Sequence, residues 1–89
     1  MNLREAQDNL DMLAREYKVP PIKVVKISEL QRSVPCYFSD APDWHIGITN
    51  DASLLDLKHE FMHYLHSLLR IPTSLEEKLI KLTEIGELE

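Results

Sequence analysis

The chain is expected to adopt an α+β fold in which helices pack on one face of a small sheet. Three features favour this class: an N-terminal segment with helical apolar spacing, a central group of short β-rich segments, and further helical segments at the C-terminal end. Strands that are grouped between helices, rather than alternating with them, are typical of it. With 89 residues, the chain should form a single domain, residues 1–89, around one modest core.

The first half of the chain is expected to form one helix and three strands. Apolar residues at helical spacing predict a helix over residues 2–18, which Pro20 and Pro21 end. Segments rich in β-branched and aromatic residues predict strands, and residues 29–33 should form a loop or a short helical turn. The strands span residues 22–27, 35–39 and 44–49, with the turn residues 40–43 joining the last two as a hairpin.

Two helices are expected in the second half of the chain. A long helix over residues 52–70 has Ser53 among its candidate N-caps. A last helix over residues 75–85 is expected to begin after the cap Ser74 and to end at Gly86. Because an amphipathic helix buries its apolar stripe, the core should cover Leu75, Leu79 and Leu82.

Charge and cysteine content exclude several classes of partner. The formal net charge of -5 matches phosphate backbones and anionic membranes poorly, so we expect no nucleic-acid partner. No segment approaches the roughly 20 apolar residues that span a bilayer, and the N-terminus lacks the apolar run of a signal peptide. Cys36 is the only cysteine, which favours the reducing cytoplasm as the location. The oligomeric state, a homo-oligomer included, stays open.

The clearest functional signal is the segment His59-Glu60-Phe61-Met62-His63, which has the H-E-x-x-H pattern. Residues four apart on a helix lie one above the other, so His59 and His63 can hold one tetrahedral zinc ion, Zn2+, from a single rigid element. Glu60 lies about 100° round the helix and is placed to act as the catalytic base that activates a zinc-bound water. The histidines should border a cleft, because the apolar face of this helix lies opposite.

A catalytic zinc usually has three protein ligands, and the third is expected on the last helix. Glu76 is the favoured candidate because it lies on the shoulder of the apolar stripe. Glu77 lies among charges and matches the capping-box partner of Ser74. There are two alternatives: Glu77 is the ligand, or neither residue is. The second alternative arises because the helix dipole favours any carboxylate in the first turn, whether or not it binds a metal. His66 lies about 10 Å along the helix from His59, too far to share one ion easily.

With an H-E-x-x-H helix followed by a separate helix that carries a glutamate, the chain resembles the gluzincins. In size and in the order of its elements it resembles the minimal soluble gluzincins, or minigluzincins, over nearly its full length. The resemblance implies an N-terminal backing helix, a three-stranded mixed sheet, an active-site helix and a glutamate helix. It also implies zinc endopeptidase activity, often held latent as in a zymogen, on peptides or unfolded proteins. Many relatives carry Asp or Asn four residues after the zinc glutamate, whereas this chain has Ile80 and Lys81 at the two corresponding positions.

The resemblance further implies that an edge strand before the active-site helix binds extended substrate. The candidate strand is Pro35-Cys36-Tyr37-Phe38-Ser39, because Pro35 cannot donate to a ladder and therefore suits an edge or a strand start. Pairing through the backbone would bind peptides of many sequences. An ordinary hairpin strand is the alternative, and Cys36 is expected to be a small buried side chain rather than an inhibitory metal ligand.

The oxyanion that forms during hydrolysis needs a hydrogen-bond donor, for which His45, Tyr64 and His66 are the candidates. If none of them serves, the enzyme would be weak or latent. A second hypothesis is a non-catalytic or self-inhibited zinc-binding domain, with a carboxylate of the acidic tail 84–89 on the metal. A third hypothesis is a metal-free interaction module in which the two motif histidines are incidental.

Overall fold

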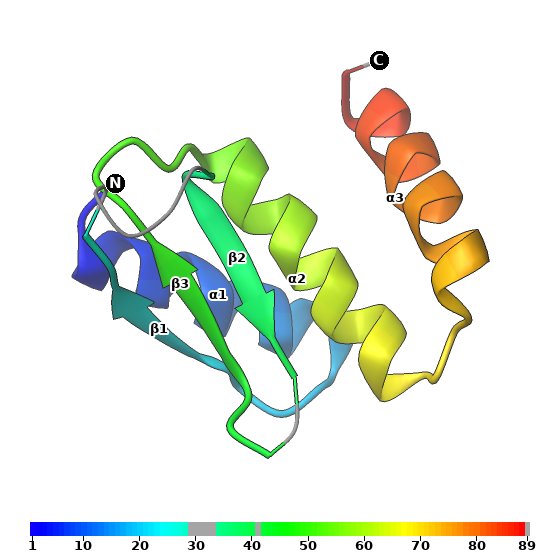
Figure 1. The fold of residues 1–89 in the computed structure, drawn as a ribbon, viewed down its shortest axis with the longest axis horizontal. Coiled ribbons are helices and arrows are strands. Elements are labelled where there is room, and N and C mark those ends of the chain that lie inside the picture. Colours follow the sequence, from blue (N-terminus) through cyan, green and yellow to red (C-terminus); the bar gives the residue numbers. More distant parts are fainter. Residues whose placement is uncertain (29–33, 41, 89) are drawn as a thin grey trace.

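The computed structural model describes residues 1–28, 34–40 and 42–88. The elements in chain order are α1 (Leu3–Tyr17), β1 (Lys23–Lys26), β2 (Cys36–Ser39), β3 (His45–Ile48), α2 (Leu54–Leu68) and α3 (Thr73–Leu88). The α+β class is confirmed, since α1 and α2 pack behind one small mixed sheet and α3 follows alongside α2 (Figure 1). The loop or helical turn predicted over residues 29–33 lies outside the described residues. None of the described helices is long and apolar enough to cross a membrane.

The sheet has the strand order β1-β3-β2, so β3 is central and the other two strands form the edges. β1 runs parallel to β3, and β2 runs antiparallel to β3 as the predicted hairpin. Side chains alternate between the two faces of a strand. Cys36 and Ile48 therefore point toward the helices and are buried, whereas Tyr37 and His45 lie on the opposite face.

On the face away from the helices, Tyr37 ties β2 to the central strand. Its ring covers Gly47, where any larger side chain would clash with the ring. The Tyr37 hydroxyl lies 3.0 Å from Nε2 of His45, and Nδ1 of His45 donates to the Asp43 carbonyl at 2.8 Å. These contacts hold β2 in place from the side opposite the helices.

The outer edge of β1 is covered by a side chain of α1. The Gln7 amide nitrogen donates to the Ile22 carbonyl at 3.0 Å, and its oxygen accepts from the Val24 N–H at 2.9 Å. Asp11 accepts a second hydrogen bond from the same amide nitrogen at 3.0 Å. Gln7 thus satisfies backbone groups that an edge strand would otherwise expose. In the described part of the chain, no strand pairs with the outer edge of β2.

The core lies between the sheet and the two helices behind it. Leu57 and Phe61 of α2 are fully buried against Ile46 and Ile48 of β3 and Leu10 of α1. Burying each such side chain stabilises the fold by roughly 1.5–3 kcal/mol. α2 begins with a capping box in which Ser53 and Asp56 bond each other's backbone N–H. The capping box fixes where α2 begins, and the burial of Leu57 and Phe61 fixes its rotation.

α3 departs from the prediction in both its bounds and its buried face. It begins at Thr73 and continues through Gly86. The prediction that its leucine stripe faces the core is wrong, since the exposed fractions are 51% for Leu75, 39% for Leu79 and 65% for Leu82. Ile80 is fully buried instead. The inner face of α3 consequently includes the residues one turn before Ile80, which are Glu76 and Glu77.

Replacing Gln7 with Ala should lower the free energy of unfolding by about 1–3 kcal/mol, because a partly buried donor and acceptor of β1 lose their partner. Urea denaturation measures the change. Asn9→Ala is the matched control, since the Asn9 amide is exposed and bonds only its own helix, at the Glu5 carbonyl. Equal losses from the two substitutions would contradict the role of Gln7 at the sheet edge.

Candidate metal centre

The H-E-x-x-H residues lie together on the side of α2 that the core leaves free. One donor atom each from His59, Glu60 and His63 lies within 4.8 Å of the other two, so this group could hold a metal ion. The Nε2 atoms of His59 and His63 are 3.2 Å apart. Two imidazole nitrogens bound to one tetrahedral zinc lie about 3.3 Å apart, given zinc–nitrogen bonds of about 2.0–2.1 Å. The spacing of the two rings therefore suits a shared zinc ion.

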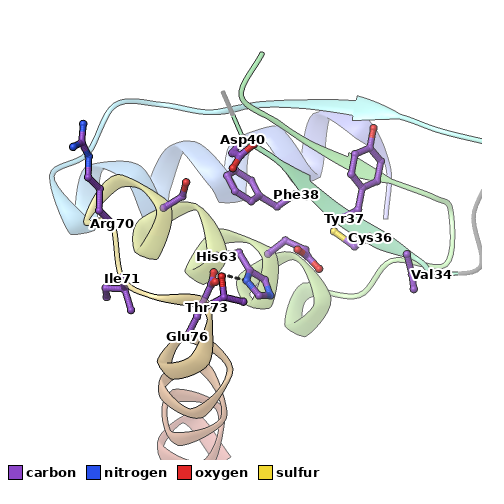
Figure 2. Close-up of a pocket in the computed structure, with 12 residues that line it drawn as sticks. Val34, Cys36, Tyr37, Phe38, Asp40, His63, Arg70, Ile71, Thr73 and Glu76 are labelled. Atoms are coloured by element: carbon purple, nitrogen blue, oxygen red, sulfur yellow. Dashed lines mark hydrogen bonds and ion pairs between the residues drawn. The ribbon is translucent and has the colours of Figure 1, made fainter. Parts of the chain in front are cut away.

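His63 also joins α2 to α3, through two glutamates. Its Nδ1 donates to Oε1 of Glu76 at 2.6 Å, the contact drawn as a dashed line in Figure 2. Oε1 of Glu77 lies 3.1 Å from Nε2, the nitrogen that faces His59. The two carboxylates thus contact opposite nitrogens of one ring. Among the described residues, the ion pairs of Glu76 and Glu77 both go to His63.

This arrangement bears on the two candidates for the third ligand. The interpretation of Glu77 as a capping-box partner is wrong, because α3 begins before Ser74 and places that serine inside the first helical turn. The N–H groups of Leu75 and Glu76 bond the Pro72 carbonyl, as expected where a helix has just begun. The Glu77 side chain is turned to His63 instead. Glu76 as a metal ligand stays a prediction, and its carboxylate lies on the nitrogen of His63 other than the one facing His59.

Glu60 is half-buried beside the two histidines. Burial raises the pKa of its carboxyl above the ordinary value, the neighbouring His63 and His59 act in the opposite direction, and Glu77 adds to the rise. Glu60 belongs to the lining of two cavities, on either side of the histidine pair. It is therefore accessible to a molecule bound in either one.

A cleft runs between β2 and α2, with Glu60 near its middle. The larger cavity, of about 570 Å³, lies between β2 and the junction of α2 with α3 (Figure 2). A smaller one, of about 260 Å³, lies toward the N-terminal end of α2. The larger is lined by Val34, Cys36, Tyr37, Phe38 and Asp40 on one side and by Glu60, His63, Ser67, Arg70, Ile71, Thr73 and Glu76 on the other. The smaller is lined by Val34, Pro35, Cys36, Leu55, Asp56, His59 and Glu60.

Most of the predicted substrate strand borders this cleft. Cys36, Tyr37 and Phe38 line the larger cavity, and Pro35 lines the smaller one with Cys36. Ser39 belongs to the strand but lines neither of the two. Arg70 and Ser67 also line the cleft, although no sequence motif marks them; they reach it because the end of α2 lies beside the end of β2.

Two of the predicted oxyanion donors are occupied elsewhere. The Tyr64 hydroxyl is part of the core and donates to the Pro20 carbonyl at 2.6 Å. His45 lies on the far face of the sheet with Tyr37 and Asp43. Nδ1 of His66 is buried and has no hydrogen-bond partner within the described chain. The two exclusions follow from tertiary contacts that residue type alone does not reveal.

Cys36 is buried as predicted, and burial is the main reason why its pKa rises from 9.0 to about 12, with Glu60 and Asp56 adding to the effect. Alkylation of the folded protein by iodoacetamide at pH 8 should be at least about tenfold slower than alkylation of the unfolded chain. The unfolded chain releases the thiol proton near pH 9 while the folded chain keeps it, so the free energy of unfolding should fall as pH rises above 9. Cys36→Ala should remove that part of the decline. Rapid labelling of folded protein, followed by mass spectrometry, would contradict the assignment.

No family model, curated protein or solved structure matches the chain. A function has to explain three features of the described residues: two imidazoles close enough to share one metal ion, three carboxylates around them, and a cleft beside a strand edge that no described strand pairs with.

Proposed function

We propose that the chain is a zinc-dependent metallopeptidase that hydrolyses peptide bonds. The observation that carries the proposal is the 3.2 Å separation of the His59 and His63 Nε2 atoms, with Glu60 beside them in an open cleft. Zinc is favoured over harder cations because two imidazole nitrogens and a carboxylate oxygen are donors that zinc prefers. Peptides are favoured as substrates because the cleft runs along the outer edge of β2, which no strand of the described residues pairs with.

The third zinc ligand in this proposal is Glu77. A metal-bound imidazole uses one nitrogen for the metal and donates from the other to a carboxylate or carbonyl. Glu76 holds Nδ1 of His63, which leaves Nε2 for the metal, and Glu77 approaches that same Nε2 at 3.1 Å. Glu76 then acts as the residue that orients His63. Glu60, Glu76 and Glu77 all lie close to the ring of His63, so a cation bound at that ring would also offset the repulsion among their charges.

The chemistry divides between the metal and Glu60. Bound zinc would polarise the scissile carbonyl and acidify a water molecule. Glu60 takes the proton of the attacking water and delivers it to the leaving amine, as a general base and then a general acid. The half-buried position of Glu60 between the two cavities gives it access to both products.

The substrate in this proposal lies extended along β2. Its backbone pairs with the outer edge of β2 and extends the sheet by one strand. Antiparallel pairing is slightly more stable than parallel pairing, so the peptide should run opposite to β2. The scissile bond then lies near Glu60, with peptide side chains entering the cavity on either side of it.

A non-catalytic or self-inhibited zinc-binding domain is the second candidate. One observation favours it: both Tyr64 and His45 are bonded away from the cleft and cannot serve as oxyanion donors there. In an active enzyme, zinc would then carry most of the stabilisation of the oxyanion, and turnover would be slow.

The purified chain should bind one zinc ion, and His59→Ala or His63→Ala should abolish tight binding because each removes a donor that faces the other. Glu77→Ala should weaken zinc binding strongly. Glu76→Ala should weaken it by about 10–100-fold, the usual cost of losing a partner that orients a metal-bound histidine. Competition titration with a chromophoric chelator measures all four variants. Unchanged zinc affinity in Glu77→Ala, with complete loss in Glu76→Ala, would return the ligand role to Glu76.

Glu60→Gln should retain the fold and the zinc and lose at least about a hundredfold in the rate of peptide cleavage. The amide keeps the size of the side chain but cannot accept the proton. Cleavage of a casein-derived fluorogenic peptide, at matched zinc content, gives the rate. Comparable turnover by Glu60→Gln would remove Glu60 from the mechanism, whereas zinc binding without turnover in the unmodified chain would favour the second candidate.

A further inference from the structure

Arg70 lies at the end of the cleft beyond the metal centre. It follows α2, is exposed, and lines the larger cavity together with Ile71 and Thr73 (Figure 2). Asp40, at the end of β2, lines the same cavity from the opposite wall. Glu60 and Glu76, the other carboxylates of this cavity, lie beside His63. Arg70 is thus the one arginine or lysine among the described residues that line it.

The backbone conformation of Arg70 is explained by its place at the end of a helix, but this does not explain why the residue is an arginine. Arg70 has a φ of 58°, and the N–H groups of Arg70 and Ile71 bond the carbonyls of Ser67 and His66. This is the left-handed turn that ends many helices and that favours glycine. α1 ends in the same way at Lys18, with a φ of 57°. A basic residue near a helix C-terminus gains some stability from the helix dipole at both positions.

What separates the two residues is where their side chains lie. Arg70 belongs to the cleft wall, whereas Lys18 lines neither of the two cavities that flank Glu60. In the described part of the chain no carboxylate pairs with Arg70. A guanidinium with five N–H donors and no carboxylate partner among the described residues, at the end of a peptide-sized cleft, is suited to bind a carboxylate.

We propose that Arg70 is a substrate-recognition residue that binds an acidic side chain of the peptide. The proposal rests on the peptidase function and adds a specificity to it. β2 and α2 run in the same direction, since the start of each lines the smaller cavity and the end of each lies at the larger one (Figure 1). A peptide antiparallel to β2 therefore has its N-terminal part beside Arg70.

The position of the acidic residue in the peptide follows from the lengths of the elements. Arg70 lies seven residues after His63, which would hold the metal beside the cleaved bond, or about 10 Å along a helix. An extended peptide rises about 3.3 Å per residue, so the acidic residue should stand about three residues before the cleaved bond. Asp40, on the opposite wall, would favour basic peptides over acidic ones. The charge preference of the protein therefore shows whether Arg70 or Asp40 has the stronger effect on peptide binding.

The test uses fluorogenic peptides that differ at one position, three residues before the cleaved bond, where they carry Glu, Gln or Lys. Zinc-loaded protein should cleave the Glu peptide with a kcat/KM roughly fivefold above that of the Gln peptide, and added salt should reduce the ratio. Arg70→Gly should bring the ratio to about one. Lys18→Gly, which makes the same backbone change at a left-handed helix end that lines neither cavity, should leave it unchanged.

Two further measurements separate the charge of Arg70 from its backbone conformation, and peptide binding from peptide cleavage. Arg70→Gln keeps the backbone strain and most of the side-chain size. If this variant loses the preference for the Glu peptide, the preference is due to the charge of the Arg70 guanidinium. Fluorescence anisotropy of labelled Glu and Gln peptides on the Glu60→Gln protein measures recognition without cleavage. Equal cleavage or binding of the two peptides, a preference for Lys, or a Glu preference that survives in Arg70→Gly would overturn the proposal. Absence of cleavage together with tighter binding of the Glu peptide would instead count against the peptidase function alone.

Discussion

The rotation of α2 about its own axis is the constraint on which the candidate centre depends. Leu57 and Phe61 are fully buried one turn apart, and they fix which side of the helix meets the sheet. His59 and His63 lie on the side that remains and so face the cleft. A rotation by one residue, about 100°, would bury an imidazole without a partner or expose Phe61. The capping box at Ser53 fixes where this helix begins, so local sequence and core packing agree on its rotation.

The elements that pack on the core could be predicted from the sequence, whereas the start and the buried face of α3 could not. The helical spacing of α1, the hairpin of β2 and β3, the N-cap Ser53 of α2 and the burial of the apolar face of α2 all reflect patterns of local spacing and turn chemistry. α3 contacts α2 and buries Ile80, and its leucines stay exposed. The rule that an apolar stripe faces the core therefore predicted the wrong buried face for α3. The two-residue error in its start then misassigned Glu77 to a capping role.

In the candidate site, too, residues on a single helix could be predicted from the sequence, whereas contacts between elements could not. His59, Glu60 and His63 are within one turn of a single helix, so their mutual geometry is set by helical spacing and could be predicted. The contacts of Glu76 and Glu77 depend on how α3 approaches α2, which no local pattern encodes. Tyr64 and His45 were plausible donors by residue type, yet each is bonded to a distant or opposite part of the fold. Arg70 joins the cleft through the relative position of two elements, and no local motif marks it.

The outer edge of β2, which no described strand covers, affects how readily the chain could self-associate. An open edge invites the same strand of another copy, and aggregation begins in this way in many sheet proteins. β2 is only four residues long, so a second copy would gain few backbone hydrogen bonds, each with a net worth of about 0.5–1.5 kcal/mol. The β1 edge, which Gln7 covers, offers even less. A short edge therefore favours ligands that bring contacts beyond the backbone, because backbone pairing alone can supply little affinity.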